Sequence, residues 1–242
     1  DSGLLVKSLN ELSRKITQGP NPKFIEDKRG IPCLKTRNIN DDEITFEGCN
    51  YISESEYKNL ERFKILYGDI LIAIQGEGSI GKSNIYTKKE KAVFSRPIGL
   101  VRVKDSMVDP FYLSAFLRSF YGKRLLERGI SGSSGQLVLA VEYIKTIPIP
   151  LPNESIQNYI GNKIRKAEEL REEAKRLKEE AEEILFNELR IKELEHLLME
   201  QNKKYNWVEE TALTERIDAY YYKAKYTILD KFISQFEYVI TK

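Results

Sequence analysis

Hydrophobic residues in the first 152 positions occur in short runs that Gly, Pro and Asn interrupt. Alternating or β-branched runs predict strands at 31–35, 70–75, 84–87, 92–94 and 100–104. Helical spacing predicts helices over 4–17 and 110–128, the second with Pro110 at a favoured first position. Alternate prolines at 147–152 exclude a helix there and predict an extended strap. We expect an α/β (α+β) globular domain over residues 1–152.

The pattern becomes helical after Pro152, since residues 153–204 contain no proline and one glycine. Alanine recurs there every seventh residue with leucine or isoleucine between, at Ala167, Leu170, Ala174, Leu177, Ala181 and Ile184. This spacing is typical of a coiled-coil seam. Asn153 or Ser155 is suited to cap the start. We expect a long helix whose seam pairs with another helix in an antiparallel coiled coil, because a solvated charged helix would not need so regular a repeat.

Charge is distributed unevenly along the chain, although 39 basic and 37 acidic residues give a net charge of only +2. Residues 1–152 carry 23 basic and 18 acidic side chains, a balance of +5. The balance is −2 over 153–204 and −1 over 205–242. The basic excess therefore lies in the first domain, where it favours a polyanionic partner.

Composition excludes several protein classes. Hydrophobic residues make up 41% of the 242 positions, enough for a sizeable core. No apolar run approaches the roughly 20 residues of a membrane-spanning helix, and the opening residues lack the features of a secretory signal. Cys33 and Cys49 are the only cysteines, too few for a disulfide scaffold or a cysteine zinc site. We expect a cytoplasmic protein with no membrane segment.

Residues 76–83, GEGSIGKS, match the phosphate-binding loop pattern G-x-x-x-x-G-K-[ST] and follow a strand-like run. Such a loop requires a helix to begin at its Lys–Ser pair, so that backbone amides face the phosphates. The residues that follow, NIYTKKEKAVF, instead favour a strand and a turn. We favour a tight hairpin that presents Gln75, Ser79, Lys82 and Ser83 to a ligand. A nucleotide-binding protein is the first alternative.

Other catalytic arrangements find little support. His196 is the only histidine and lies in the predicted long helix, which excludes Ser-His-Asp, Cys-His and most zinc sites. Asp41, Asp42 and Glu43 are adjacent and are typical of a turn before a strand. We find no motif for adenine methylation and no cofactor-binding glycines. We expect a non-enzymatic chain with no catalytic residue, metal site or cofactor of its own.

Five segments follow one another in a recognisable order: LNELSRKITQGPNPK (9–23), GIPCLKTRNIN (30–40), YGDILIAIQGEGSIGKS (67–83), DPFYLSAFLRS (109–119) and SSGQLVLAVEYIKTIPIPLP (133–152), before the long helix. In this order they resemble the target-recognition domain and conserved helix of type I restriction–modification specificity (S) subunits. The resemblance covers residues 4–200. It implies a non-catalytic subunit that gives partner enzymes their DNA specificity, and a hairpin rather than a nucleotide site at 76–83.

The resemblance also implies partners. They are double-stranded DNA, a modification (methyltransferase) subunit with S-adenosylmethionine chemistry, and a restriction subunit that uses ATP and Mg. Residues 153–204 would act as a spacer and dimerisation helix, and 205–242, with ERIDAYYYKAKY at 215–226, resemble the start of a second recognition domain. Two arrangements stay open, a homodimer through the long helix and a piece of a longer chain.

Loops of the first domain provide the candidate DNA contacts, because Lys and Arg neutralise phosphates, while Arg, Lys, Asn and Gln read base edges. The candidates are Lys35, Arg37, Asn38, Gln75, Ser79, Lys82, Ser83, Arg96, Ser131, Ser133, Ser134 and Gln136. A coiled-coil scaffold without specific DNA binding is the second alternative, and it predicts no preferred site on any duplex.

Overall fold

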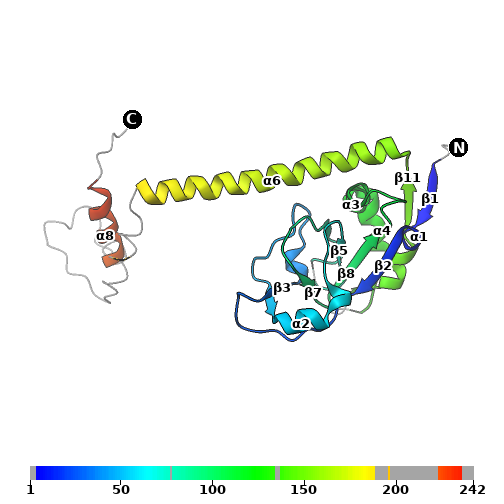
Figure 1. The fold of residues 1–242 in the computed structure, drawn as a ribbon, viewed down its shortest axis with the longest axis horizontal. Helices are drawn as coiled ribbons and strands as arrows, with labels where there is room; N and C mark the ends of the chain where they lie inside the picture. The colour runs from blue at the N-terminus through cyan, green and yellow to red at the C-terminus, as the bar shows by residue number, and fades with distance from the viewer. Residues whose placement is uncertain (1–3, 77, 134–136, 189–195, 197–222, 236–242) are drawn as a thin grey trace. The chain divides into compact units, whose positions relative to one another are not determined.

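The computed structural model describes residues 4–76, 78–133, 137–188, 196 and 223–235 (Figure 1). Contacts within the chain define two compact units, residues 1–171 and 172–242. The first unit contains the sheets. In the second unit, helix α8 spans Ala224–Ile233. None of the helices in these described ranges is both long and apolar enough to cross a membrane.

A four-stranded antiparallel sheet forms the centre of the first unit, in the strand order β2–β8–β5–β6. These strands span Ser13–Gln18, Ile98–Val103, Ile70–Ala73 and Ser83–Ile85. The strands predicted at 70–75, 84–87 and 100–104 are confirmed, with ends shifted by one or two residues.

Side chains alternate between the two faces of this sheet, because successive residues of a strand point to opposite sides. Ile70 and Ile72 of β5 pack in one core, whereas Leu71 packs in another. Val101 and Leu100 of β8 divide in the same way. Helices cover the first core, and the main ones are α3 (Pro110–Arg118), α4 (Phe120–Arg128) and α5 (Val141–Thr146).

The second core lies between the other face of this sheet and a smaller sheet of order β4–β3–β7. These strands span Asn50–Ile52, Ile31–Leu34 and Val93–Phe94, which confirms the strands predicted at 31–35 and 92–94. Strand β3 pairs antiparallel with β4 and parallel with β7. Helix α2 (Glu54–Asn59) packs on the small sheet. Two 3-10 turns complete this region, η1 (Thr36–Asn38) and η2 (Glu61–Phe63).

The N-terminal segment contradicts the helix predicted over 4–17. It forms strand β1 (Leu5–Ser8), the one-turn helix α1 (Leu9–Leu12) and strand β2. Ser8 caps α1, because its hydroxyl accepts from the Glu11 N–H while the Glu11 carboxylate accepts from the Ser8 N–H at 2.8 Å. Strand β1 pairs with β11 and β2 pairs with β8, so contacts distant in sequence outweigh local helix propensity.

The single helix predicted over 110–128 is two helices that meet at Ser119. Ser119 ends α3, and its hydroxyl caps α4 by accepting from the Gly122 N–H at 3.2 Å. A side chain at Gly122 would not fit, since a Cβ there would lie 2.1 Å from a carbonyl oxygen of α3. The apolar spacing continues across this break, which is why periodicity alone predicts one helix.

The strap at 147–152 is extended as predicted, and its strand β11 (Pro148–Leu151) pairs with β1. Asn153 then caps helix α6 (Glu154–Glu188), because its side-chain oxygen accepts from the Ile156 N–H at 3.0 Å. The predicted continuation to 204 lies outside the described residues except at His196, as does the predicted tail 205–242 except at 223–235. A small hairpin of β9 (Ile130–Ser131) and β10 (Val138–Leu139) completes the first unit.

Candidate nucleic-acid interface

Several loops leave the central sheet at the same end of its strands. Strands β2 and β5 end there and β8 begins there. The Gln18 side-chain amide donates to the Arg96 carbonyl at 3.0 Å, and the Gln75 N–H donates to the Pro97 carbonyl at 3.3 Å. We term this side the loop edge; it comprises residues 18, 35–37, 75–76, 78–82, 95–97, 131–133 and 137–138.

Strands β3 and β7 bring two candidate cations to the loop edge. The strands run parallel, with Leu34 opposite Phe94. The N–H and the hydroxyl of Ser95 both donate to the Leu34 carbonyl, at 3.0 and 2.9 Å. Lys35 directly follows Leu34, and Arg96 directly follows Ser95. The two segments that carry these cations therefore leave the small sheet together.

The glycine-rich segment is a hairpin, as predicted. The Ala73 N–H donates to the Lys82 carbonyl at 2.8 Å, and the Gly81 N–H donates to the Ala73 carbonyl at 2.9 Å. Gly81 has a φ of 87°, a backbone conformation that favours glycine. Strand β6 begins at Ser83, where a phosphate-binding loop would need the start of a helix. The segment therefore lacks the geometry that the nucleotide-binding alternative requires.

The hairpin also contacts two other loops. A Cβ added to Gly76 would lie 3.4 Å from the Thr36 hydroxyl, so this loop packs against the turn after β3. Gln75 forms an isolated antiparallel bridge with Val138, which places the β9–β10 hairpin beside it. Ser131 and Ser133 are exposed in that hairpin, whereas the predicted contacts Ser134 and Gln136 lie outside the described residues.

Cations of the loop edge have no acidic partner among the residues that the structure describes. In the described ranges, no carboxylate lies within 4.0 Å of the charged groups of Lys35, Lys82 or Arg96. The Lys35 ammonium lies 6.0 Å from the ring centre of Phe24. The exposed Arg37 donates to the Gly48 carbonyl and also meets no acid in this part of the structure. Such a surface suits a phosphate backbone.

Two predicted contact residues do not reach the surface. Asn38 is fully buried; its side-chain oxygen accepts from the Lys35 N–H at 2.9 Å, and its amide donates to the Glu47 carbonyl at 2.8 Å. Ser83 lies in β6 with 2% of its surface exposed. Asn38 therefore shapes the loop and Ser83 belongs to the sheet, so neither can read a base edge in this conformation.

Sequence reasoning missed some residues at or beside this edge. Gln18 ties the end of β2 to the segment that precedes β8, and Phe24 is 47% exposed beside Lys35. Leu137 is 47% exposed next to the bridge formed by Val138. The Gly-Pro-Asn-Pro turn at 19–22 could have indicated Phe24 as a loop residue, but nothing in the sequence pairs Gln18 with Arg96.

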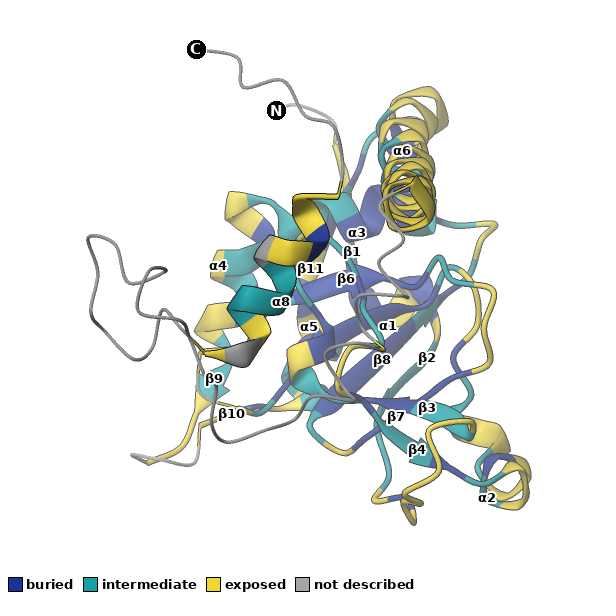
Figure 2. Cartoon of the chain, turned by 90° about the vertical axis from the view of Figure 1, so that its left-hand side faces the viewer, coloured by how far each residue is buried: buried dark blue, intermediate teal, exposed yellow. Residues whose placement is uncertain are grey.

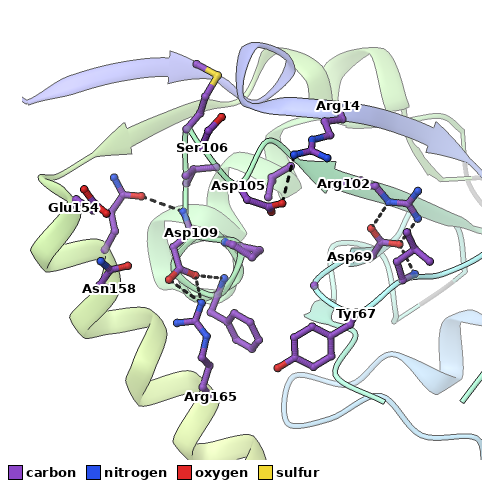
Figure 3. Close-up of a pocket in the computed structure, with 18 residues that line it drawn as sticks. Arg14, Tyr67, Asp69, Arg102, Asp105, Ser106, Asp109, Glu154, Asn158 and Arg165 are labelled. Carbon is purple, nitrogen blue, oxygen red and sulfur yellow. Dashed lines mark hydrogen bonds and ion pairs between the residues drawn. The ribbon is translucent and has the colours of Figure 1, made fainter. Parts of the chain in front are cut away.

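The opposite edge of the same sheet contains a pocket of about 720 Å³ (Figure 3). Its three arginines each face a carboxylate, in the pairs Arg14–Asp105 (3.5 Å), Arg102–Asp69 (2.6 Å) and Arg165–Asp109 (2.9 Å). Hydrogen bonds to Asp69 raise the pKa of the Arg102 guanidinium. The described residues contain no cluster of three or more acidic, His or Cys side chains placed to bind a metal. Charge pairing makes this pocket a poor phosphate site.

The predicted helix-pairing residues of α6 are largely exposed (Figure 2). Leu170, Leu177 and Ile184 are 51%, 50% and 58% exposed. Ala174 and Ala181 are also exposed, and Ala167 is half-buried. Sequence reasoning missed two further exposed residues on the same side of the helix at 3.6 residues per turn, Ile156 and Tyr159.

The family model for the type I restriction modification DNA specificity domain matches residues 4–183. The chain belongs to this family. It is 27% identical over 158 residues to the MjaX specificity subunit, and 25% identical over 178 residues to the MjaVIII specificity subunit, both named for type I restriction enzymes of Methanocaldococcus jannaschii. These matches cover 64% and 69% of this chain but only 37% and 42% of those proteins.

Solved structures share the fold. The type I restriction–modification S subunit from M. genitalium has a TM-score of 0.51 at 15% identity, over 84% of this chain and 48% of that one. A chain from a structure of type I R-M complex assembly and conformational transition has a TM-score of 0.52 at 19% identity, over 77% and 44%. The predicted fold, a mixed α/β domain followed by a long helix, is confirmed.

Proposed function

We propose that this chain is the sequence-specific DNA-recognition component of a type I restriction–modification system. The observation that carries the proposal is the loop edge of a member of the specificity-domain family. There, cations from separate segments lie beside polar side chains and have no acidic partner among the described residues. The chain would act in the cytoplasm without catalysis of its own. It would direct adenine methylation and restriction by its partner subunits.

Phosphate contacts would supply most of the affinity. Lys35, Arg37, Lys82 and Arg96 are the cations of the loop edge, and each phosphate that they neutralise releases counterions, so binding would weaken as salt rises. Base readout requires side chains that reach the major groove, where Gln pairs with adenine and Arg or Lys with guanine. Gln75, at the base of the hairpin, is the amide candidate. The hydroxyls of Ser79, Ser131 and Ser133 suit phosphate or base contacts.

Helix α6 would set the separation between recognition domains by pairing its exposed seam with another long helix. A homodimer would read a two-fold symmetric bipartite site, and a second, different domain would read an asymmetric one. The methyltransferase subunit would bring S-adenosylmethionine, and the restriction subunit would bring ATP and Mg. These cofactors are therefore proposed for the partners.

Selection from randomised duplexes by the full chain tests the proposal. We expect enrichment of one preferred motif, and co-expression with a cognate methyltransferase should place modified adenines in the same motif. Lys35→Ala should weaken all duplexes equally where Lys35 contacts phosphate, or relax one base position where it reads an edge. Arg14→Ala, which removes the same charge from the opposite edge of the sheet, is the matched control.

The outcome separates the proposal from the scaffold alternative. A selection without enrichment, made with folded protein, would favour a coiled-coil scaffold. Equal losses of affinity for Lys35→Ala and Arg14→Ala would indicate attraction by net charge alone, and they would also contradict recognition by the loop edge.

A further inference from the structure

The first turns of α6 contact the globular domain through a narrow row of residues on one side of the helix. Gln157, Gly161 and Glu168 are the buried residues among those described in this helix, and Ile160 and Ile164 pack against the first core. Spacings of three and four residues put these positions on one side of the helix. Helix and domain therefore share a defined contact that lies entirely within the first unit.

Asp109 is central to this contact (Figure 3). Its carboxylate, 7% exposed, accepts from one Arg165 nitrogen at 3.1 and 2.9 Å. The same carboxylate caps α3 by accepting from the Phe111 N–H at 2.8 Å. The Arg165 guanidinium also lies 4.2 Å from the ring centre of Phe111. One carboxylate thus connects the start of α3 with α6.

Gly161 allows this close approach. A Cβ at Gly161 would lie 2.5 Å from Oδ2 of Asp109 and 2.9 Å from a nitrogen of Arg165. Glycine is less favourable than alanine inside a helix, so the stability of α6 alone gives no reason for it. The packing of Asp109 against the helix backbone does give a reason.

Gln157 ties the strap to the same place. Its side-chain oxygen accepts from the Asp109 N–H at 3.2 Å, and its amide donates to the Pro152 carbonyl at 2.9 Å. Tyr112 of α3 donates its hydroxyl hydrogen to the Pro150 carbonyl at 2.6 Å. The strap, α3 and α6 therefore meet in one hydrogen-bonded cluster.

We propose that Asp109, Gly161 and Arg165 form a positioning joint that holds the first turns of α6, residues 154–171, at one fixed angle to the rest of the first unit. The joint would act through the helix, because its residues lie away from the loop edge and touch no proposed DNA contact. It would fix the direction in which the loop edge points relative to these first turns, and hence the spacing between two half-sites. Only this last consequence rests on the proposed function.

Two substitutions separate the joint from the fold. Asp109→Asn keeps a good helix cap for α3 but removes the anion that faces Arg165. Gly161→Ala favours the helical state of α6 but displaces the Asp109 side chain. Arg165→Lys keeps the positive charge but loses the guanidinium geometry, and it serves where either of the others fails to fold. Glu169→Ala, exposed on the same helix, is the control.

A distance between spin labels in the full chain measures the angle directly. The labels are attached to cysteines that replace Lys58 of α2 and Lys166 of α6, both exposed. The native Cys33 and Cys49 are buried, and burial raises the pKa of the Cys33 thiol to about 12, which protects it from the reagent. Control circular-dichroism spectra and melting curves establish that each variant is folded.

We expect one narrow distance distribution in the wild type and in Glu169→Ala. A shifted or broadened distribution in a folded joint variant supports the joint. Wild-type distributions in all folded joint variants overturn it, whatever the protein does with DNA.

Duplex selection then tests the consequence for spacing. A joint variant should retain the bases of each half-site while enrichment of the wild-type spacer falls about tenfold, equal to about 1.4 kcal/mol. A general loss of affinity without a change in spacer preference would contradict the positioning role. A wild-type selection with no motif would refute the proposed function instead, and the distance measurement would still decide the joint.

Discussion

The two edges of the central sheet use the same residue types in different ways. At the loop edge, Lys35, Lys82 and Arg96 face no acid in the described structure. At the opposite edge, Arg102 and Arg165 each donate hydrogen bonds to a carboxylate that is at most 7% exposed. Positive charge is therefore neutralised within the protein at one edge and left available at the other.

This difference indicates which cations stabilise the fold and which are available to bind a ligand. A buried ion pair is costly to break, because it leaves one charge without solvent or partner. An exposed cation without a partner contributes little to stability, yet it remains free to meet a phosphate. Net charge alone, at +2, does not distinguish the two edges.

The largest effect should follow from Arg102→Ala. Asp69, 1% exposed, would lose hydrogen bonds of 2.7 and 2.6 Å from this guanidinium and stay buried without its cationic partner. We expect the free energy of unfolding to fall by about 3–5 kcal/mol. Chemical denaturation measures the loss, and the DNA affinity of the protein that remains folded should not change.

A double substitution provides the control for that experiment. Asp69→Leu with Arg102→Met removes both charges and should recover most of the stability, since apolar replacements of buried pairs are often neutral. A double variant as unstable as Arg102→Ala would show that packing, or the Leu66 N–H that loses its acceptor on Asp69, and not the unpaired charge, explains the loss.

The next effect should be on DNA affinity. Replacing both Lys35 and Arg96 by alanine should weaken binding by roughly tenfold to a hundredfold and lower the slope of log affinity against log salt by about 1 for each lost phosphate contact. The melting temperature should stay near that of the wild type. Fluorescence anisotropy at several salt concentrations measures the slope, and an unchanged slope would remove these residues from the interface.

A smaller effect links the loop edge to the fold. Gly19 packs against the backbone of Ser95, where a Cβ would lie 2.3 Å from the carbonyl oxygen. Gly19→Ala should therefore displace the loop that carries Arg96 and lower stability by about 1–3 kcal/mol. Thermal melting measures the loss. A variant with wild-type stability would show that the loop moves without cost.

The smallest effect concerns pH. Burial raises the pKa of the Glu168 carboxyl above its usual value of 4.5, although Arg171 and Arg118 oppose the shift. The folded state then binds this proton more tightly than the unfolded state, so stability is complete below the unfolded pKa and is lost as pH rises through the folded pKa. Glu168→Gln should be slightly more stable than the wild type at neutral pH.

Melting curves of the two proteins test this sign. The difference should vanish well below the unfolded pKa of 4.5, where the carboxyl is protonated in both states. A Gln variant that is less stable at neutral pH would mean that the ionised carboxylate stabilises the fold through Arg171, and the burial argument would then be wrong.

The sequence predicts best those elements whose conformation depends on neighbouring residues alone. The strap follows from proline chemistry, and the hairpin at Gly76–Ser83 follows from its glycines and the β-branched residues after it. The segment 4–17 could not be predicted in this way. Its strands exist because β8 and β11, distant in sequence, offer backbone partners, and one capping box at Ser8 suffices for the single helical turn between them.

The candidate site was predictable by segment and not by side chain. Lys35 ends the strand predicted at 31–35 and Arg96 follows the strand predicted at 92–94, so the sequence places both next to loops. Asparagine is a residue type that reads base edges, but the Asn38 side chain is buried and hydrogen-bonded to the backbone of its own loop. The pairing of Arg165 with Asp109 joins residues far apart in sequence, and no local spacing signals it.

The shared acceptor at Leu34 has a consequence for engineering. Because Ser95 donates two hydrogen bonds to that one carbonyl, the segments that begin at Lys35 and Arg96 share a single anchor beneath the surface. Replacing one of these segments with that of a relative would also alter the anchor of the other segment. Exchange of both segments as a cassette, with Ser95 retained, is the smaller perturbation and the better route to an altered target preference.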